Sequence, residues 1–477
     1  MPHSTKVILK GFYWNAIQLV INQFFSFVVR LVLARLLFPE QFGLIGMAVI
    51  FIGFIRTINE LGITAALIQR EEEQMNLEHY HTSFWSGLVW SLLLFLVMSF
   101  AVAPLGAWFY DEPILETLII VMSISIMFTP FSVVNKAILT RKMNFKSIAK
   151  VENSASFIAG VISIVLAFSG AGVWALAFNS VAVMIIVVPL YLKFCDWRPK
   201  FIWEKQAFKD IFGFGMFTSM TNLINYLINN FDYLVIGKLV SAEALGAYTF
   251  AFILTDTVKN RIASVISNVM YPVYSKLQSD KEKSKALYNR VVEYNCILIY
   301  PIMLGLFIFA EPLIINIFGE KWVDSVYPSQ LLAAAAMIQL LVFSNTTLIR
   351  GLGFANFEFR LQFIKALIYM PILFAGIYLN GIIGAAWAVL INRAVAVVIT
   401  IITFRLFKLN YTFNDFYTSV KTPFLATIAS GLVGYALYHY ANLNYILAAI
   451  VMLLLYAGII YWKKGSEVIE LIKSLKK

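Results

Sequence analysis

Lysine and arginine alternate with long apolar runs along this chain, a pattern typical of a protein that crosses a bilayer many times. Every second gap between apolar runs is basic, and the intervening gaps carry almost no basic residues. Short cytoplasmic loops retain Lys and Arg, whereas translocated loops lose them. Of the 37 basic residues, 29 fall on one side of the predicted spans, three on the other and five within spans. We therefore expect a multi-pass membrane protein with both termini in the cytoplasm.

The composition agrees with a bilayer environment. Hydrophobic residues make up 60% of the 477 residues and charged residues 13%, against about a quarter charged in soluble domains. The net charge of +11 lies in short loops beside spans, so it predicts contact with membrane lipids rather than nucleic acid. Cys195 and Cys296 have no ligand-type spacing, which predicts neither disulfides nor a metal site. His79 and His81 are interpreted as a solvated turn, and no cofactor motif is present.

A bilayer core needs about twenty apolar residues per helix, and on that criterion the chain holds fourteen spans. The expected fold is therefore an all-α integral membrane protein. The spans cover residues 11–36, 42–68, 82–106, 114–137, 148–168, 171–193, 209–239, 243–270, 290–317, 329–349, 361–380, 382–405, 420–440 and 443–462.

An internal repeat divides these spans into two lobes. The segment Arg35–Gly43 matches Lys238–Gly246 at a constant offset of 203, with a base, a Leu, a Glu and a Gly in common. Six helices per lobe is an even number, so the repeat is parallel, about an axis along the membrane normal. We predict an N-lobe (1–194), a cytoplasmic interfacial linker (195–208), a C-lobe (209–406), and a region with two further helices and an amphipathic cytoplasmic tail (407–477).

Two equivalent helices, the first and the seventh, carry stripes of polar residues at helical spacing. Side chains three or four residues apart share one helix face. Amides that face lipid would stay unpaired, so the stripes are expected to line a hydrated cavity; hydrogen bonds between helices are the alternative. The stripes comprise Asn15, Gln18, Asn22, Ser26 and Arg30, and Thr218, Asn222, Asn225, Asn229 and Asp232.

Five basic residues fall within predicted spans, where each costs about 2.5–3.5 kcal/mol near the bilayer centre. They are Arg30, Arg56, Lys259, Arg261 and Arg393. Arg56 has a possible local partner in Glu60, and Lys259 has one in Asp256. The surplus predicts an anionic ligand, and the planar guanidinium suits phosphate. Snorkelling or structural pairing is the alternative, and it explains Lys259 about as well.

The intramembrane acids suggest ion coupling, since such carboxylates commonly mark ion pathways. We predict that Glu60, Asp232 and Asp256 bind Na⁺ or exchange H⁺, and the sequence does not choose between the two ions. A Walker loop is absent, which argues against an ATP-driven pump. The predicted outer loops hold about ten residues at most, too few for a catalytic domain. We therefore expect a protein that is not an enzyme.

The chain resembles the Wzx-type polysaccharide flippases, in particular the colanic-acid exporter branch, of the multidrug/oligosaccharidyl-lipid/polysaccharide superfamily. The similarity spans nearly the whole chain. It rests on the segments Leu33–Leu44, Ile58–Ile63, Leu67–Arg70, Asn229–Gly237, Leu245–Tyr248 and Phe318–Trp322.

The resemblance implies a transporter of the bacterial inner (plasma) membrane that serves the synthesis of surface polysaccharide. Such proteins move an undecaprenyl-diphosphate-linked oligosaccharide from the cytoplasmic to the outer leaflet by alternating access, and contact with the polysaccharide polymerase machinery is implied as well. Related flippases use cavity arginines on the first, second and eighth helices, where Arg30, Arg56 and Arg261 lie in this chain. These three with Arg393 would hold the diphosphate, and Asn22, Asn225 and Asn229 would contact sugar hydroxyls.

Three other functions compete with this one. A cation-coupled multidrug exporter of the same superfamily would share the two lobes, but it needs no anionic headgroup. A membrane polysaccharide polymerase or ligase would need a large outer loop with catalytic residues. A structural scaffold would not need two matched polar stripes.

Overall fold

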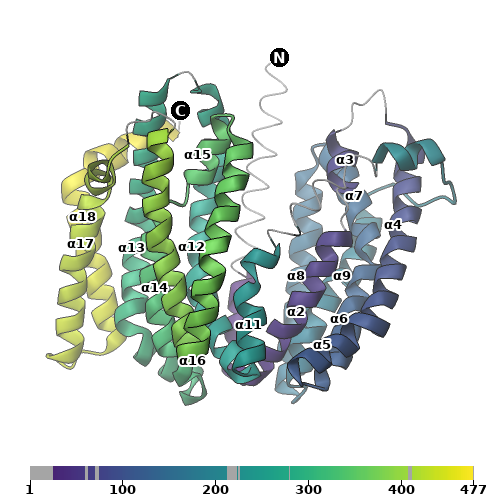
Figure 1. Ribbon diagram of the computed structural model, residues 1–477, viewed down its shortest axis with the longest axis horizontal. Coiled ribbons are helices and arrows are strands. Elements are labelled where there is room, and N and C mark those ends of the chain that lie inside the picture. The colour runs from purple at the N-terminus through teal and green to yellow at the C-terminus, as the bar shows by residue number, and fades with distance from the viewer. Residues whose placement is uncertain are drawn as a thin grey trace. The chain divides into compact units, whose positions relative to one another are not determined.

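A computed structural model describes residues 25–475, apart from 60–62, 70–74, 212–222, 224–225, 279 and 407–410. The backbone is helical almost throughout, and the described residues form no strand (Figure 1). The chain forms two compact units, Met1–Gly246 and Ala247–Lys477, which are described separately. The predicted lobe boundaries at 194 and 209 stay a prediction.

The first unit is a bundle of helices joined by short turns. Its helix ends follow local signals: the Asn144 side chain accepts a hydrogen bond from the Ser147 amide at the start of α8, 3.2 Å away, which satisfies a free donor of the first turn. The helices are α2 (Pro39–Asn59), α3 (Ile63–Gln69), α4 (Leu77–Val97), α5 (Ala103–Tyr110), α6 (Ile114–Met127), α7 (Thr129–Arg141), α8 (Phe145–Phe168), α9 (Val173–Phe194) and α11 (Phe231–Leu239).

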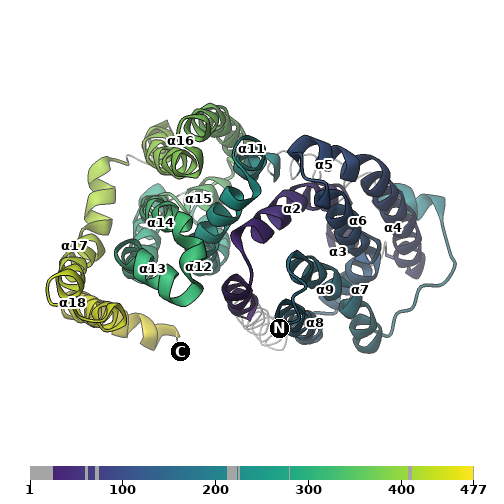
Figure 2. The same cartoon turned by 90° about the horizontal axis from the view of Figure 1, so that it is seen from below.

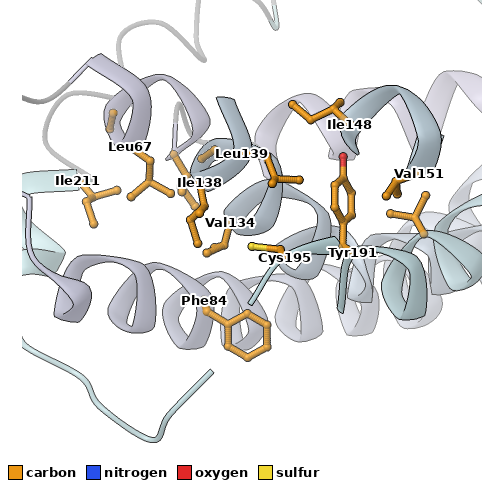
Figure 3. Close-up of a cluster of buried hydrophobic side chains, with 14 of the residues drawn as sticks. Leu67, Phe84, Val134, Ile138, Leu139, Ile148, Val151, Tyr191, Cys195 and Ile211 are labelled. Carbon is orange, nitrogen blue, oxygen red and sulfur yellow. The ribbon is translucent and has the colours of Figure 1, made fainter. Parts of the chain in front are cut away.

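A buried apolar cluster fixes one end of this unit (Figure 3). Tyr191 and Cys195, at the end of α9, lie among side chains of α3, α4, α7 and α8. Phe84 of α4 joins them from one side, and Ile211 joins from just beyond the predicted linker. The cluster therefore holds both ends of that linker against the bundle.

The predicted linker itself is bound along the first turns of α4. The Lys200 amide donates to His81 Nδ1 (3.1 Å), and the Lys200 carbonyl accepts from Trp85 Nε1 (2.8 Å). Four residues further along the linker, the Glu204 amide donates to Thr82 Oγ1 (3.0 Å). These three bonds join neighbouring residues of α4 to two points of the linker, four residues apart. They therefore fix the position of the linker along α4.

We expect Thr82→Val to loosen the linker without disturbing the core. Valine has nearly the same shape as threonine but cannot accept the Glu204 amide proton, and one such hydrogen bond contributes about 1 kcal/mol. Hydrogen exchange at Glu204 should become several-fold faster, and the amide of Asn230, which donates to a backbone carbonyl, should exchange as before. An unchanged rate at Glu204 would contradict this role for Thr82.

The second unit contains longer helices. In it α14 packs between α13 and α16, and α17 and α18 form a pair that packs against α13 (Figure 2). The helices are α12 (Ala242–Lys276, which begins in the first unit), α13 (Lys281–Phe318), the 3₁₀ turn Glu320–Ser325, α14 (Val326–Leu340), α15 (Asn345–Gly351), α16 (Ala355–Leu406), α17 (Phe413–His439) and α18 (Tyr445–Leu475). The predicted amphipathic tail continues α18 without a break up to Leu475.

The helix α16 is a hairpin of two arms. Its backbone leaves helical geometry at Asn380 and at Gly381, whose φ of 53° is in the left-handed region that glycine tolerates. On either side of this turn Gly376 and Gly384 pack so closely that a Cβ on either would overlap the backbone carbonyl of the other. The arms therefore match two predicted spans, 361–380 and 382–405.

The fold class expected from the sequence is confirmed. Among the described residues, ten helical segments are long and apolar enough to cross a membrane, and one of them, Arg360–Leu406, contains both arms of α16. The predicted spans 11–36, 42–68, 209–239 and 243–270 include residues or side chains outside the described set. The protein is thus a multi-pass, all-α membrane protein, and the number fourteen stays a prediction.

The two repeat segments touch each other through their glycines, at the beginnings of α2 and α12. A Cβ on Gly43 would overlap the Ala242 carbonyl oxygen, and a Cβ on Gly246 would overlap that of Pro39. The offset of 203 that relates the repeats converts one contact into the other: 43 becomes 246, and 39 becomes 242. This local contact is therefore reciprocal, as in a two-fold interface, and supports the repeat read from the sequence.

Candidate substrate site

Part of the predicted site lies outside the described residues. This holds for Asn22, Glu60 and Asn225, and of Arg261 only the backbone, within α12, is described. The predicted Arg56–Glu60 pair therefore stays untested. The remaining predicted residues belong to two groups, one in each unit.

In the first unit, Arg56 lies on α2 within a polar surrounding. Its Nη2 is 3.4 Å from Ser125 Oγ of α6, and Tyr226 is close enough to interact with it electrostatically. The Tyr226 hydroxyl donates to the carbonyls of Val49 and Ile50 (3.0 and 3.1 Å) and fills the space beside Gly53, where a Cβ would overlap it. A glycine at 53 thus allows the ring to lie across α2 one turn before Arg56.

Arg30 lies on the described end of the first predicted span, where it is exposed within the unit and close to Tyr233. The two arginines thus each have a tyrosine of the seventh span as neighbour. No contact between Arg30 and Arg56 is found in the part of the chain that the structure describes.

The seventh span is interrupted at Asn230, which has φ −120° and ψ 13° and precedes α11. The Asn230 side chain donates to the Tyr226 carbonyl (2.8 Å). It thus adds a hydrogen bond to a carbonyl one turn before the break. Asp232 is buried in the first turn of α11 and accepts a hydrogen bond from the Tyr233 amide (3.0 Å), while Asn229 is exposed. A helix N-terminus is a favourable position for a carboxylate, because the helix dipole is positive there.

In the second unit, Lys259 is a fully buried cation. Its side chain has 0% exposure, and its Nζ is 2.5 Å from Asp256 Oδ1, so the predicted Asp256–Lys259 pair is confirmed. The ammonium also donates to Gln339 Oε1 of α14. An ionised lysine in this position is tolerated because a carboxylate and an amide oxygen replace its water.

Two more cations of the second unit continue from this pair: Arg393 lies near Lys259, and Lys365 lies near Arg393. Arg393, on the second arm of α16, interacts electrostatically with both Lys259 and Lys365, which is on the first arm. Glu358 also interacts with Lys365, but its Oε2 accepts from Arg350 Nε and Nη2 at 3.1 and 2.9 Å. Lys365 lies on the first arm of α16, within the segment Arg360–Leu406, which is long and apolar enough to cross a membrane.

Sequence reasoning missed two members of this group, Lys365 and Gln339. The position of Lys365 inside a predicted span was the available signal. No local pattern indicates Gln339, because it meets Lys259 across 80 residues of chain. Together the second unit holds three neighbouring cations and one carboxylate committed to them, an arrangement that can attract an oxyanion.

Comparison with known proteins places the chain among proteins of polysaccharide synthesis. It is 24% identical to the teichuronic acid biosynthesis protein TuaB of Bacillus subtilis, over 91% of this chain and 90% of that protein. It is 23% identical to the lipopolysaccharide biosynthesis protein WzxC of Escherichia coli (90% and 87% covered), and 25% identical to the succinoglycan biosynthesis transport protein ExoT of Rhizobium meliloti (90% and 86%).

The fold is similar to solved transporters. The lipid II flippase MurJ in an inward closed conformation superimposes with a TM-score of 0.73, covering 95% of this chain and all of that one at 14% identity. An inward-facing multidrug transporter of the MATE family and MOP superfamily gives 0.58, with 85% and 99% covered at 15% identity. Residues 32–327 match the family described as polysaccharide biosynthesis protein, more than half of the chain, and the chain therefore belongs to that family.

Proposed function

We propose that this protein is a flippase. It moves an undecaprenyl-diphosphate-linked oligosaccharide from the cytoplasmic to the outer leaflet of the bacterial plasma membrane by alternating access, for surface polysaccharide synthesis. Both termini lie in the cytoplasm, as the distribution of basic residues indicates. After release the oligosaccharide passes to the polymerase machinery.

The observation that carries this proposal is the surplus of cations on membrane-spanning helices. Arg56, Lys259, Lys365 and Arg393 all lie within predicted spans. Of the three that belong to the second unit, only Lys259 forms an ion pair with a carboxylate within the described residues. Cations at this depth are costly, and a diphosphate offsets that cost. Arg30, Arg56, Arg261 and Arg393 hold the diphosphate, while Asn22, Asn225 and Asn229 contact sugar hydroxyls.

The acids supply the coupling. Asp232 lies buried beside the interruption of the seventh span, and interrupted helices commonly form ion sites in transporters. Asp256 is bound to Lys259, so a change in its ionisation alters the charge that the cargo meets. With Glu60, these carboxylates bind Na⁺ or exchange H⁺ during the transport cycle.

The multidrug exporter is the less favoured function. Relatives that match nearly the full chain are described by polysaccharide products. The cation groups also suit a phosphorylated cargo better than the cationic or neutral compounds that need no anionic headgroup to be recognised.

The function is tested by measuring surface polysaccharide in a strain that lacks its chromosomal copy of this protein and produces each variant instead. Arg30→Ala and Arg56→Ala should each lower polymer output by about 10- to 100-fold, because a charge-assisted contact contributes about 1.5–3 kcal/mol and 1.4 kcal/mol is tenfold. Arg56→Lys should fall between, since it keeps the charge but loses the planar fork.

The matched control is Arg405→Ala, which removes an exposed cation at the end of α16 and should leave output within about twofold. Immunoblots of membranes verify that all variants are present at equal levels. Wild-type output from both Arg30→Ala and Arg56→Ala at equal protein levels would refute the assignment of the site.

A further inference from the structure

The hairpin α16 brings two cations to the same level of the membrane. Gly376 and Gly384 touch across the turn, so residues whose numbers sum to about 760 face each other along the two arms. Lys365 therefore lies opposite residue 395, two positions from Arg393. At 1.5 Å per residue the two cations differ in height by about 3 Å, which agrees with their electrostatic interaction.

The neighbouring carboxylates are already engaged. Glu358 accepts from Arg350 through Oε2 and from Gln362 through Oε1 (3.0 Å), and Asp256 is bound to Lys259. Neither Lys365 nor Arg393 has an ion pair with any acid among the residues that the structure describes. Both side chains are only partly buried within the unit, so a ligand can reach them.

Lys259 cannot serve as a third ligand-binding cation in this arrangement. Its ammonium is enclosed, with Asp256 on one side and the Gln339 amide on the other. It does add positive potential at Arg393, with which it interacts electrostatically. The local surplus thus falls on Lys365 and Arg393.

We propose that Lys365 joins Arg393 in an oxyanion-binding pair for the cargo, which adds a lysine to the arginines already assigned. A guanidinium offers two parallel hydrogen bonds to one phosphate or carboxylate, and an ammonium adds a mobile point charge. The oxyanion comes from the lipid diphosphate or from an acidic sugar of the oligosaccharide. This inference rests on the proposed function, which it extends to residues of the α16 hairpin.

Flipping of two defined cargoes by the full-length protein in proteoliposomes tests the pair. One cargo is undecaprenyl diphosphate with a neutral trisaccharide, and the other has one sugar replaced by a uronic acid. Lys365→Gln with Arg393→Gln should slow at least one cargo by about tenfold or more, the effect of losing about 1.4 kcal/mol. Equal loss for both cargoes identifies the diphosphate as the ligand, and selective loss for the acidic cargo identifies the sugar carboxylate.

The matched controls are Arg360→Gln and Arg405→Gln, which remove exposed cations from the same hairpin and should stay within twofold of wild type. Lys365→Arg, with Arg393 intact, keeps both positive charges and should retain most of the wild-type flipping rate. Unchanged flipping of both cargoes by the double variant would overturn the proposal.

A binding measurement separates this inference from the proposed function. Sodium pyrophosphate and methyl glucuronide are titrated into purified full-length protein, and heat or a shift of the unfolding midpoint is recorded. If the wild type binds either probe and the double variant does not, the result supports the pair. This holds even if the wild type flips neither cargo, which would refute the flippase function but not the oxyanion site. If the wild type and the double variant bind both probes equally, or the wild type binds neither, the pair is not an oxyanion site.

Discussion

Replacing Gly246 by alanine should destabilise the protein by about 3 kcal/mol or more. The added methyl group would overlap the Pro39 carbonyl oxygen, and a backbone atom at the start of a helix cannot turn aside as a side chain does. Overpacking against movable side chains already costs about 1–3 kcal/mol, so relief here requires α2 and α12 to separate. We expect a lower thermal unfolding midpoint in detergent and less protein in the membrane.

The reciprocal contact provides a second variant and an internal check. Gly43→Ala overlaps the Ala242 carbonyl in the same way, and separation of the same two helices relieves both overlaps. The double variant should therefore cost clearly less than the sum of the two single ones. Gly458→Ala in α18 is the matched control, because nothing lies within 4 Å of the added Cβ. Additive losses, or wild-type midpoints for both single variants, would contradict a shared contact.

This contact shows what a repeat in the sequence can and cannot predict. Aligning Arg35–Gly43 with Lys238–Gly246 predicted that the two glycines occupy equivalent places. The alignment did not predict that each glycine packs against the other repeat segment. Two segments can occupy equivalent places in a repeat without being close in space. The spacing of four between Ala242 and Gly246 was the available signal, since small residues four apart allow helices to approach closely.

The fold was largely predictable because bilayer insertion restricts the backbone to a few forms. Apolar length gave the spans, and even the turn inside α16 was placed correctly between residues 380 and 382. Contacts within one helix were predictable too, as Asp256 and Lys259 show, because a spacing of three places both on one face. Gln339, on a different helix, was not predictable from spacing, and its contact with Lys259 depends on how α14 packs.

The second large effect concerns this buried pair. Asp256→Asn should destabilise the second unit by about 3–5 kcal/mol, because it leaves the Lys259 ammonium enclosed without a counter-charge and close to Arg393. The thermal unfolding midpoint of the purified protein measures the loss. Asp280→Asn is the matched control: Asp280 pairs with Lys283 at the same spacing of three, but with side-chain exposures of 38% and 75%. Exposed pairs of this kind contribute little to stability, so the unfolding midpoint should hardly change.

Removing the cation as well distinguishes a structural role of Asp256 from a role in transport. In Asp256→Asn with Lys259→Met, an apolar side chain of similar length replaces the enclosed ammonium, so most of the lost stability should return. If Asp256 also couples transport to an ion, this stable double variant should still fail to respond to an imposed Na⁺ or H⁺ gradient. Restored stability with a normal gradient response would leave Asp256 as the partner of Lys259 alone, and full stability of the single variant would refute the buried pair. The single and the double variant thus separate folding from coupling. The destabilisation by an unpaired charge disappears when the Lys259 charge is removed. The loss of a carboxylate that binds Na⁺ or H⁺ is not repaired by removing Lys259.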